Sequence, residues 1–251
     1  MEQTVVRIRT LEIGSGMPKI CVPVVGKTEK EILEGAERAK AAKPDLVEFR
    51  VDWYEEAADS KKVVALLEKL RKCLGELPVL FTFRSSREGG EAALSDDAYQ
   101  SLNEAAIASG FVDCVDVELF SGDAVVKAVV AAAHSNHVKV IASNHDFEKT
   151  PAAEELLARL QKMEALGADI PKIAVMPQSS KDVLTLLTVT ESWRETGKTP
   201  VITMSMAGEG LISRLCGEIF GSAVTFGAAG KSSAPGQIDA EELRRILEII
   251  H

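Results

Sequence analysis

Short apolar runs recur along this chain, and longer segments with the spacing of amphipathic helices separate them. The runs have the length and the β-branched or aromatic content of buried strands. We predict eight strands, at residues 19–23, 46–52, 79–84, 112–119, 138–143, 172–176, 201–205 and 223–226. They recur roughly every 25 to 35 residues, which is the repeat of a strand followed by a helix.

Helix start and stop signals occupy the segments between these strands. Thr28 and Glu31 have the spacing of a capping box. Gly75 follows a helical apolar pattern and is predicted to end it. Thr150 is predicted to be an N-cap, with Pro151 at the first helical position. The chain therefore alternates strand and helix along its length.

These alternations predict a single α/β domain over residues 1–251, a (β/α)8 TIM barrel. An open doubly wound sheet is the alternative. Residues 1–17 alternate apolar and polar positions and contain Gly14 and Gly16. We expect them to form a short N-terminal β-hairpin that closes the bottom of the barrel.

Charged residues fall on the strand face that should line the barrel. In the second strand, Val47, Phe49 and Val51 suit the helix layer, so the residues between them point inward. The same alternation turns inward Glu48, Arg50, Asp52, Thr82, Arg84, Asp116, Glu118 and Lys172, and it places His145 on the inward side just past its strand. Many of them lie at C-terminal strand ends, where barrel enzymes build active sites. The alternative is an antiparallel sheet with one solvated face.

Lys172 is the most informative of these residues, because it lies in an apolar run. Burial disfavours the ammonium and favours the neutral amine, which is a nucleophile for ketones. The resulting iminium withdraws electrons from the adjacent carbon, and His145 is a suitable proton carrier. The alternatives are a lysine whose head reaches water and an ordinary loop histidine.

Two glycine-containing loops and one histidine pair are further candidates. Residues 84–91 form a polar loop after a strand, of the kind that holds barrel chemistry, or a solvated turn. Residues 227–237 follow the last strand and are predicted to be a phosphate cradle or a lid. His134 and His137 have metal-like spacing, but no third ligand accompanies them, and we expect no metal.

Composition narrows the function classes. The net charge of −9 argues against nucleic-acid binding and requires local arginines for any anionic substrate. No apolar stretch is long enough to span a membrane, and residues 1–4 do not resemble a signal peptide. The four cysteines are scattered without a metal-type pair. We therefore expect a cytoplasmic protein.

Several ordered segments together resemble the type I 3-dehydroquinate dehydratases. They are residues 48–52, 81–84, 88–91, 116–119, 143–147, 171–174, 204–206, 210, 213–214 and 233–237. The resemblance implies a barrel lyase that converts 3-dehydroquinate to 3-dehydroshikimate in the shikimate pathway of aromatic amino acid biosynthesis. It implies no cofactor, because a lysine supplies the electron sink. It also implies a homodimer.

The resemblance also implies roles for individual residues. Lys172 matches the Schiff-base lysine, His145 the general acid/base and Glu88 the carboxylate that works with it. The positions that match substrate-binding and lid residues are Glu48, Arg50, Arg84, Arg214, Ser233 and Gln237. Cys21 departs from the family pattern, since a hydroxyl residue is expected there, and a thiol hydrogen-bonds more weakly.

Two other functions compete with this prediction. A class I aldolase or transaldolase-like barrel also uses a strand lysine, but it requires a phosphate site, for which residues 227–237 are the candidate. A non-catalytic barrel would use the inward charges only to neutralise one another. Turnover of 3-dehydroquinate and a covalent lysine adduct separate these readings.

Overall fold

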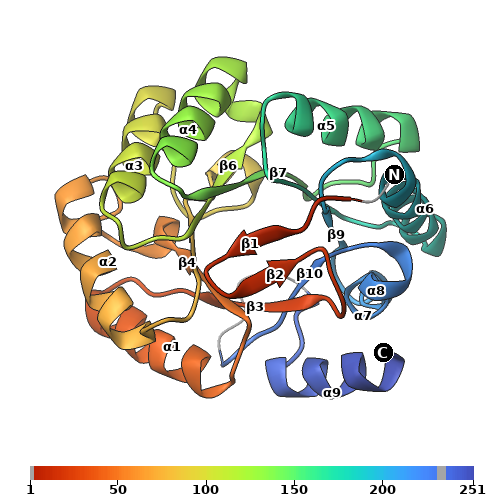
Figure 1. The fold of residues 1–251 in the computed structure, drawn as a ribbon, viewed down its shortest axis with the longest axis horizontal. Coiled ribbons are helices and arrows are strands. Elements are labelled where there is room, and N and C mark those ends of the chain that lie inside the picture. The colour runs from red at the N-terminus through yellow and green to blue at the C-terminus, as the bar shows by residue number, and fades with distance from the viewer. Residues whose placement is uncertain (1–2, 231–235) are drawn as a thin grey trace.

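The computed structural model describes residues 3–230 and 236–251, and within them eight strands form one parallel sheet (Figure 1). Their order is β10 (Val224–Phe226), β3 (Lys19–Val24), β4 (Leu46–Arg50), β5 (Val79–Thr82), β6 (Cys114–Glu118), β7 (Lys139–Asp146), β8 (Ile170–Val175) and β9 (Ile202–Ser205). A bridge between Val201 and Ser222 brings the two edge strands together. The sheet is thus a nearly closed barrel, which confirms the predicted (β/α)8 fold.

Helices surround this barrel (Figure 1). The longer ones are α1 (Glu29–Ala41), α2 (Ser60–Leu74), α3 (Asp96–Ala108), α4 (Asp123–Ser135), α5 (Ala153–Ala165), α6 (Ser180–Thr196) and α9 (Ala240–Ile250). Shorter elements are α7 (Ile212–Leu215), α8 (Gly217–Phe220) and the 3-10 turns η1 (Val51–Trp53), η2 (Ser86–Glu88) and η3 (Leu119–Ser121). As predicted, Val47, Phe49 and Val51 belong to the core between strands and helices.

An antiparallel hairpin of β1 (Val6–Ile8) and β2 (Leu11–Ile13) lies across one end of the barrel, drawn in red in Figure 1. Ile8 and Ile13 are buried in a cluster with Leu46, Cys114 and Ile170. Those three residues are the first of their strands. The hairpin therefore closes the N-terminal end of the barrel, as the sequence predicts.

Three aspartates secure the starts of the strands in the same way. Asp45, Asp113 and Asp169 each precede a strand directly, and each accepts a hydrogen bond from a backbone N–H of the preceding strand. The three bonds come from Ile20 at 2.6 Å, Val79 at 2.8 Å and Val140 at 2.9 Å. A carboxylate that accepts a backbone N–H fixes how far one strand is shifted along the next.

Each of these aspartates stands three residues before an inward charge, and those charges are Glu48, Asp116 and Lys172. They come from the alternate strands β4, β6 and β8. Alternate strands of a TIM barrel contribute to the same layer of its interior. The repeated spacing thus places two carboxylates and one amine at a common depth.

Two local predictions are wrong. His145 does not lie past its strand, because β7 continues to Asp146 and pairs His145 with Ala174 of β8. Thr150 is not an N-cap: its hydroxyl donates to the carbonyl of Met176 at 3.1 Å, and α5 begins after Ala152. In both cases a contact with residues that follow α5, Ala174 or Met176, decides the local structure.

Candidate active site

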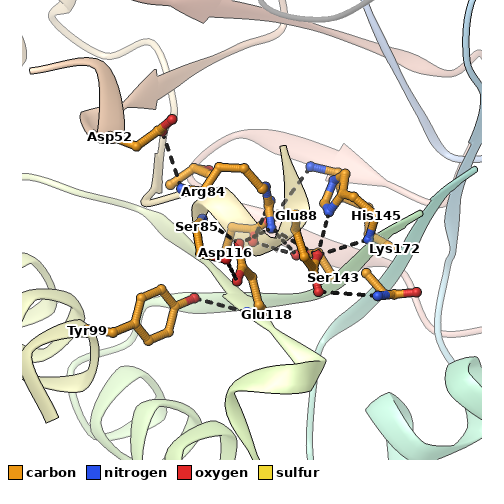
Figure 2. Close-up of polar contacts among 12 residues, drawn as sticks. Asp52, Arg84, Ser85, Glu88, Tyr99, Asp116, Glu118, Ser143, His145 and Lys172 are labelled. Atoms are coloured by element: carbon orange, nitrogen blue, oxygen red, sulfur yellow. Dashed lines mark hydrogen bonds and ion pairs between the residues drawn. The ribbon is translucent and has the colours of Figure 1, made fainter. Parts of the chain in front are cut away.

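Lys172 points into the barrel and is almost fully buried, with 3% of its surface exposed (Figure 2). Its Nζ lies 3.3 Å from Asp116 Oδ2 and 3.8 Å from Glu48 Oε1. It also lies 4.6 Å from the ring centroid of Phe226. The amine is therefore held between two carboxylates and above an aromatic face.

Arg84 connects the neighbouring carboxylates. Its Nη2 lies 2.8 Å from Asp116 Oδ1, and its Nη1 lies 3.0 Å from Glu118 Oε1 and 3.6 Å from Glu88 Oε2. Ser143 accepts from Arg84 at 3.0 Å and donates to Asp116 at 2.6 Å. This network fixes Arg84 in the interior, where the sequence predicts it (Figure 2).

His145 is held by Glu88, which η2 brings over from the loop after β5. Glu88 Oε2 lies 3.0 Å from His145 Nδ1 and accepts the backbone N–H of His145 at 2.9 Å. A carboxylate at Nδ1 selects the tautomer that carries its proton there and leaves Nε2 as a base. Asp146 accepts from the backbone of Glu148 and Lys149.

Burial and charge adjust the protonation of this cluster. Burial lowers the pKa of His145 well below its usual value, and Arg84, Lys172 and Arg50 lower it further. Burial raises the pKa of Glu88 to about 7, although Arg84 opposes the rise. The imidazole is therefore neutral near neutral pH, which suits a proton acceptor.

The pKa of Asp116 is lowered, whereas that of Glu88 is raised. Burial by itself raises this pKa, but Arg84 and Lys172 outweigh burial and hold it below its usual value. Asp116 therefore stays ionised beside the lysine.

Glu48 and Arg50 also face the interior from β4. Arg50 pairs with both oxygens of Asp52 at 2.8 Å, and Thr82 donates to Glu48 Oε1 at 2.9 Å. Burial lowers the pKa of Arg50, but its hydrogen bonds and the charge of Asp52 outweigh burial and raise it above its usual value.

A cavity that is partly open to solvent brings these side chains together. Its predicted lining residues are Glu48, Arg50, Arg84, Glu88, His145, Lys172, Arg214 and Gln237. Arg214 is 2% exposed, and burial lowers its pKa to about 10. Ser233 lies outside the described residues. A buried site with one amine, one imidazole and several fixed cations can carry out imine and proton-transfer chemistry on a small anion.

Comparison with known proteins decides the family. A model described as type I 3-dehydroquinase matches residues 20–251. The chain belongs to this family. It is accordingly an enzyme of the hydro-lyase class.

Relatives from the same family cover the chain almost completely. The 3-dehydroquinate dehydratase of Listeria innocua is 57% identical over 244 residues, which are 97% of each chain. The type I 3-dehydroquinate dehydratase of Clostridium difficile has a solved structure with a TM-score of 0.97 and 52% identity, covering 99% of this chain and 98% of that one. The structure of the 3-dehydroquinate dehydratase from Geobacillus kaustophilus has a TM-score of 0.96 and 43% identity, covering 98% of this chain and 96% of that one.

The likeness to enzymes with other names extends only to the fold. A 3-hexulose-6-phosphate synthase has a TM-score of 0.61 at 17% identity, covering 91% of this chain and 99% of that one. This likeness to a sugar-phosphate enzyme carries no argument for the aldolase alternative.

The search for inward charges in the sequence did not identify the apolar residues that line the cavity. The cavity also contacts Phe147, Met204, Met206 and Phe226, which form its apolar wall. Met204 and Met206 share the alternation of inward positions, and that alternation is the signal that could have found them. Ala174 is the next inward residue of β8 after Lys172, and it also lines the cavity.

Two further expectations concern groups outside the cavity. His134 lies 2.9 Å from Asp169, and no cluster of His, Cys, Asp or Glu in residues 3–230 and 236–251 has the arrangement to hold a metal ion. In the same residues, no helix has the length and apolar character that crossing a bilayer requires.

Proposed function

We propose that this enzyme dehydrates 3-dehydroquinate to 3-dehydroshikimate through a Schiff base on Lys172, in the shikimate pathway of aromatic amino acid biosynthesis. The observation that carries the proposal is the buried Lys172 amine in one cavity with His145 and three arginines. The names of the relatives support the substrate. The solved structure of the Clostridium difficile relative contains covalent modified comenic acid. A covalent adduct is consistent with a nucleophilic side chain in the corresponding site.

The reaction begins at the ring ketone. The Lys172 nitrogen attacks the carbonyl carbon, and the oxygen leaves as water after proton transfers, which gives an iminium. The neutral imidazole of His145 takes a proton from the carbon beside the iminium. The C–H electron pair then forms a C=C bond, and the π pair of the C=N bond moves onto nitrogen. The resulting enamine expels the hydroxyl group from the next carbon.

His145 also completes the proton balance. The imidazolium formed in the first transfer protonates the departing hydroxyl, so water leaves instead of hydroxide. A second water then hydrolyses the iminium, releasing the conjugated ketone and the free Lys172 amine. Glu88 holds Nδ1 throughout and stabilises the transient positive charge on the ring.

The remaining groups recognise the substrate. Arg214 pairs with the substrate carboxylate, and Glu48, Arg50 and Arg84 hold ring hydroxyls and support the site. Gln237 lines the cavity, and there it helps to exclude water from the iminium. No cofactor enters this scheme, because the lysine provides the electron sink.

Borohydride reduction tests the mechanism directly. Incubation with 3-dehydroquinate and borohydride should give a stable adduct that peptide mass spectrometry places on Lys172, and Lys172→Ala should abolish it. His145→Ala should slow turnover by about 100-fold or more while the adduct still forms. Turnover of sugar phosphates alone, or unmodified Lys172 in an active enzyme, contradicts the proposal.

Oligomeric state and location remain predictions. We propose a homodimer in the cytoplasm, and light scattering of the purified protein checks the first point. A mass equal to the single chain of 27.0 kDa contradicts the dimer.

A further inference from the structure

A hydrogen-bonded chain leads from helix α5 to the catalytic imidazole. Arg159 Nη1 donates to Asn144 Oδ1 at 2.5 Å, and Asn144 Nδ2 donates to Glu88 Oε1 at 3.2 Å. The other oxygen of Glu88 contacts His145 Nδ1 at 3.0 Å. Arg159 lies in the helix layer and does not line the cavity, so it acts through the other residues of the chain.

The chemistry of these groups gives Arg159 a specific task. An asparagine amide can present either its oxygen or its NH₂ group, depending on how it is turned. A guanidinium has donors only, so Asn144 must turn its oxygen toward Arg159. Its NH₂ group then faces Glu88, where a donor favours the ionised carboxylate.

Arg159 is well placed to hold this orientation. Its side chain is 13% exposed, its guanidinium carbon lies 5.2 Å from the ring centroid of Phe120, and it pairs with Glu155 one turn earlier. Asn144 is 1% exposed, so no bulk water competes for its amide. The pair is therefore an ordered contact between a helix and a strand.

We propose that Arg159 is a positioning residue for the reaction, which fixes the Asn144 amide so that Glu88 stays ionised and aligned with His145. The proposal rests on the proposed roles of Glu88 and His145. Other charged groups also face Glu88, namely Arg84 after β5, Glu118 from β6 and His145 from β7. We expect these groups to remain in place when Arg159 is replaced, so a change in the pH dependence of kcat can be assigned to the Asn144 amide.

The test is the pH dependence of kcat in the full-length enzyme. In Arg159→Met the amide is free to turn its oxygen toward Glu88, which then binds a proton more readily. The acidic limb of kcat should move to higher pH by about one unit, so turnover below that limb falls about tenfold. KM and the borohydride adduct on Lys172 should change little, and Arg159→Lys, which keeps a donor-only group, should restore the limb.

Three further variants make the assignment specific. Arg194→Met is the matched control, since Arg194 is a helix arginine that donates to the carbonyl of Ile219; its limb should equal the wild type. Asn144→Leu should shift the limb by itself, and adding Arg159→Met should shift it no further. If Arg159→Met does not fold, the shift in Asn144→Leu and its absence in Arg159→Lys carry the test.

An unshifted limb in folded Arg159→Met or in Asn144→Leu overturns the role of Arg159, as does an additive shift in the double variant. Absence of 3-dehydroquinate turnover in the wild-type enzyme is a different result. That result removes the proposed function and this assignment with it.

Discussion

At the scale of single residues, the buried charges of this barrel are held by partners from other strands. Lys172 of β8 contacts Asp116 of β6, and Arg84 contacts both Asp116 and Glu118. Bringing such groups out of water costs free energy that good geometry only partly offsets. The cluster therefore lowers stability, and the catalytic role proposed for its residues accounts for its presence.

The burial of Glu88 makes the free energy of unfolding depend on pH. Because burial raises its pKa to about 7, the folded state binds more protons than the unfolded state up to that pH. Its stabilising protonation is complete below its unfolded value near 4.5 and is lost as pH rises through about 7.

Glu88→Gln should therefore be more stable than the wild type at pH 8, by about 1 to 3 kcal/mol, while turnover falls. Urea unfolding at pH 8 and at pH 5 measures the difference, which should shrink at the lower pH. Glu154→Gln at an exposed position is the control and should be neutral at both. A Glu88→Gln variant that loses stability at pH 8 contradicts the expectation.

At the scale of elements, the loop after β5 must bring Glu88 back over the barrel. Gly90 permits this path, because a Cβ built on it lies 1.8 Å from the carbonyl oxygen of Arg84. Gly89 next to it has a left-handed φ of 80° and lies against the ring of Phe147. The turn depends on close approach of two backbone segments.

Gly90→Ala should consequently destabilise the protein by about 1 to 3 kcal/mol and reduce turnover. Gly208→Ala is the matched control, because a Cβ at Gly208 meets no atom within 4 Å. Thermal unfolding and steady-state kinetics of both variants check this. Equal behaviour of the two would show that the loop relaxes around the new methyl group.

The elements also show how far the sequence alone can lead. Strand alternation predicts which charges face inward, because the period of two is set by the backbone. It does not predict that Asp116 meets Lys172, since that contact depends on how strands shift across the barrel. The chain from Arg159 to Asn144 was missed for the same reason, as it joins a helix to a strand. The pattern predicted an amine nucleophile at Lys172 and a proton carrier at His145, and the family resemblance added the specific reaction.

At the scale of the whole molecule, the two ends of the barrel have different tasks. The cavity opens at the end where the strands finish, and the hairpin covers the end where they begin. Arg9 at the hairpin turn lies 2.7 Å from Asp113 and 2.5 Å from Glu76, which fastens the hairpin to the barrel. The end of the barrel that the hairpin closes is thus distant from the end that carries the cavity.

Ile13→Ala should therefore lower the free energy of unfolding by about 2 to 5 kcal/mol and leave kcat and KM unchanged at temperatures where the variant is folded. Ile249→Ala, at a position 83% exposed, is the matched control and should have little effect. Urea unfolding and steady-state kinetics measure both quantities. A large change in KM for Ile13→Ala would contradict the separation of the two ends.

The aspartate that stands three residues before each interior charge has a practical consequence for protein engineering. Anchor and charge are encoded in one four-residue peptide, Asp45 to Glu48, Asp113 to Asp116 or Asp169 to Lys172. Such a peptide contains both the aspartate that fixes the strand register and the charge whose depth in the barrel this register sets. Transferring the Asp169–Lys172 peptide to β4 or β6 should place an amine at the same depth on another strand. The position of the nucleophile around the barrel axis could then be changed without redesigning the scaffold.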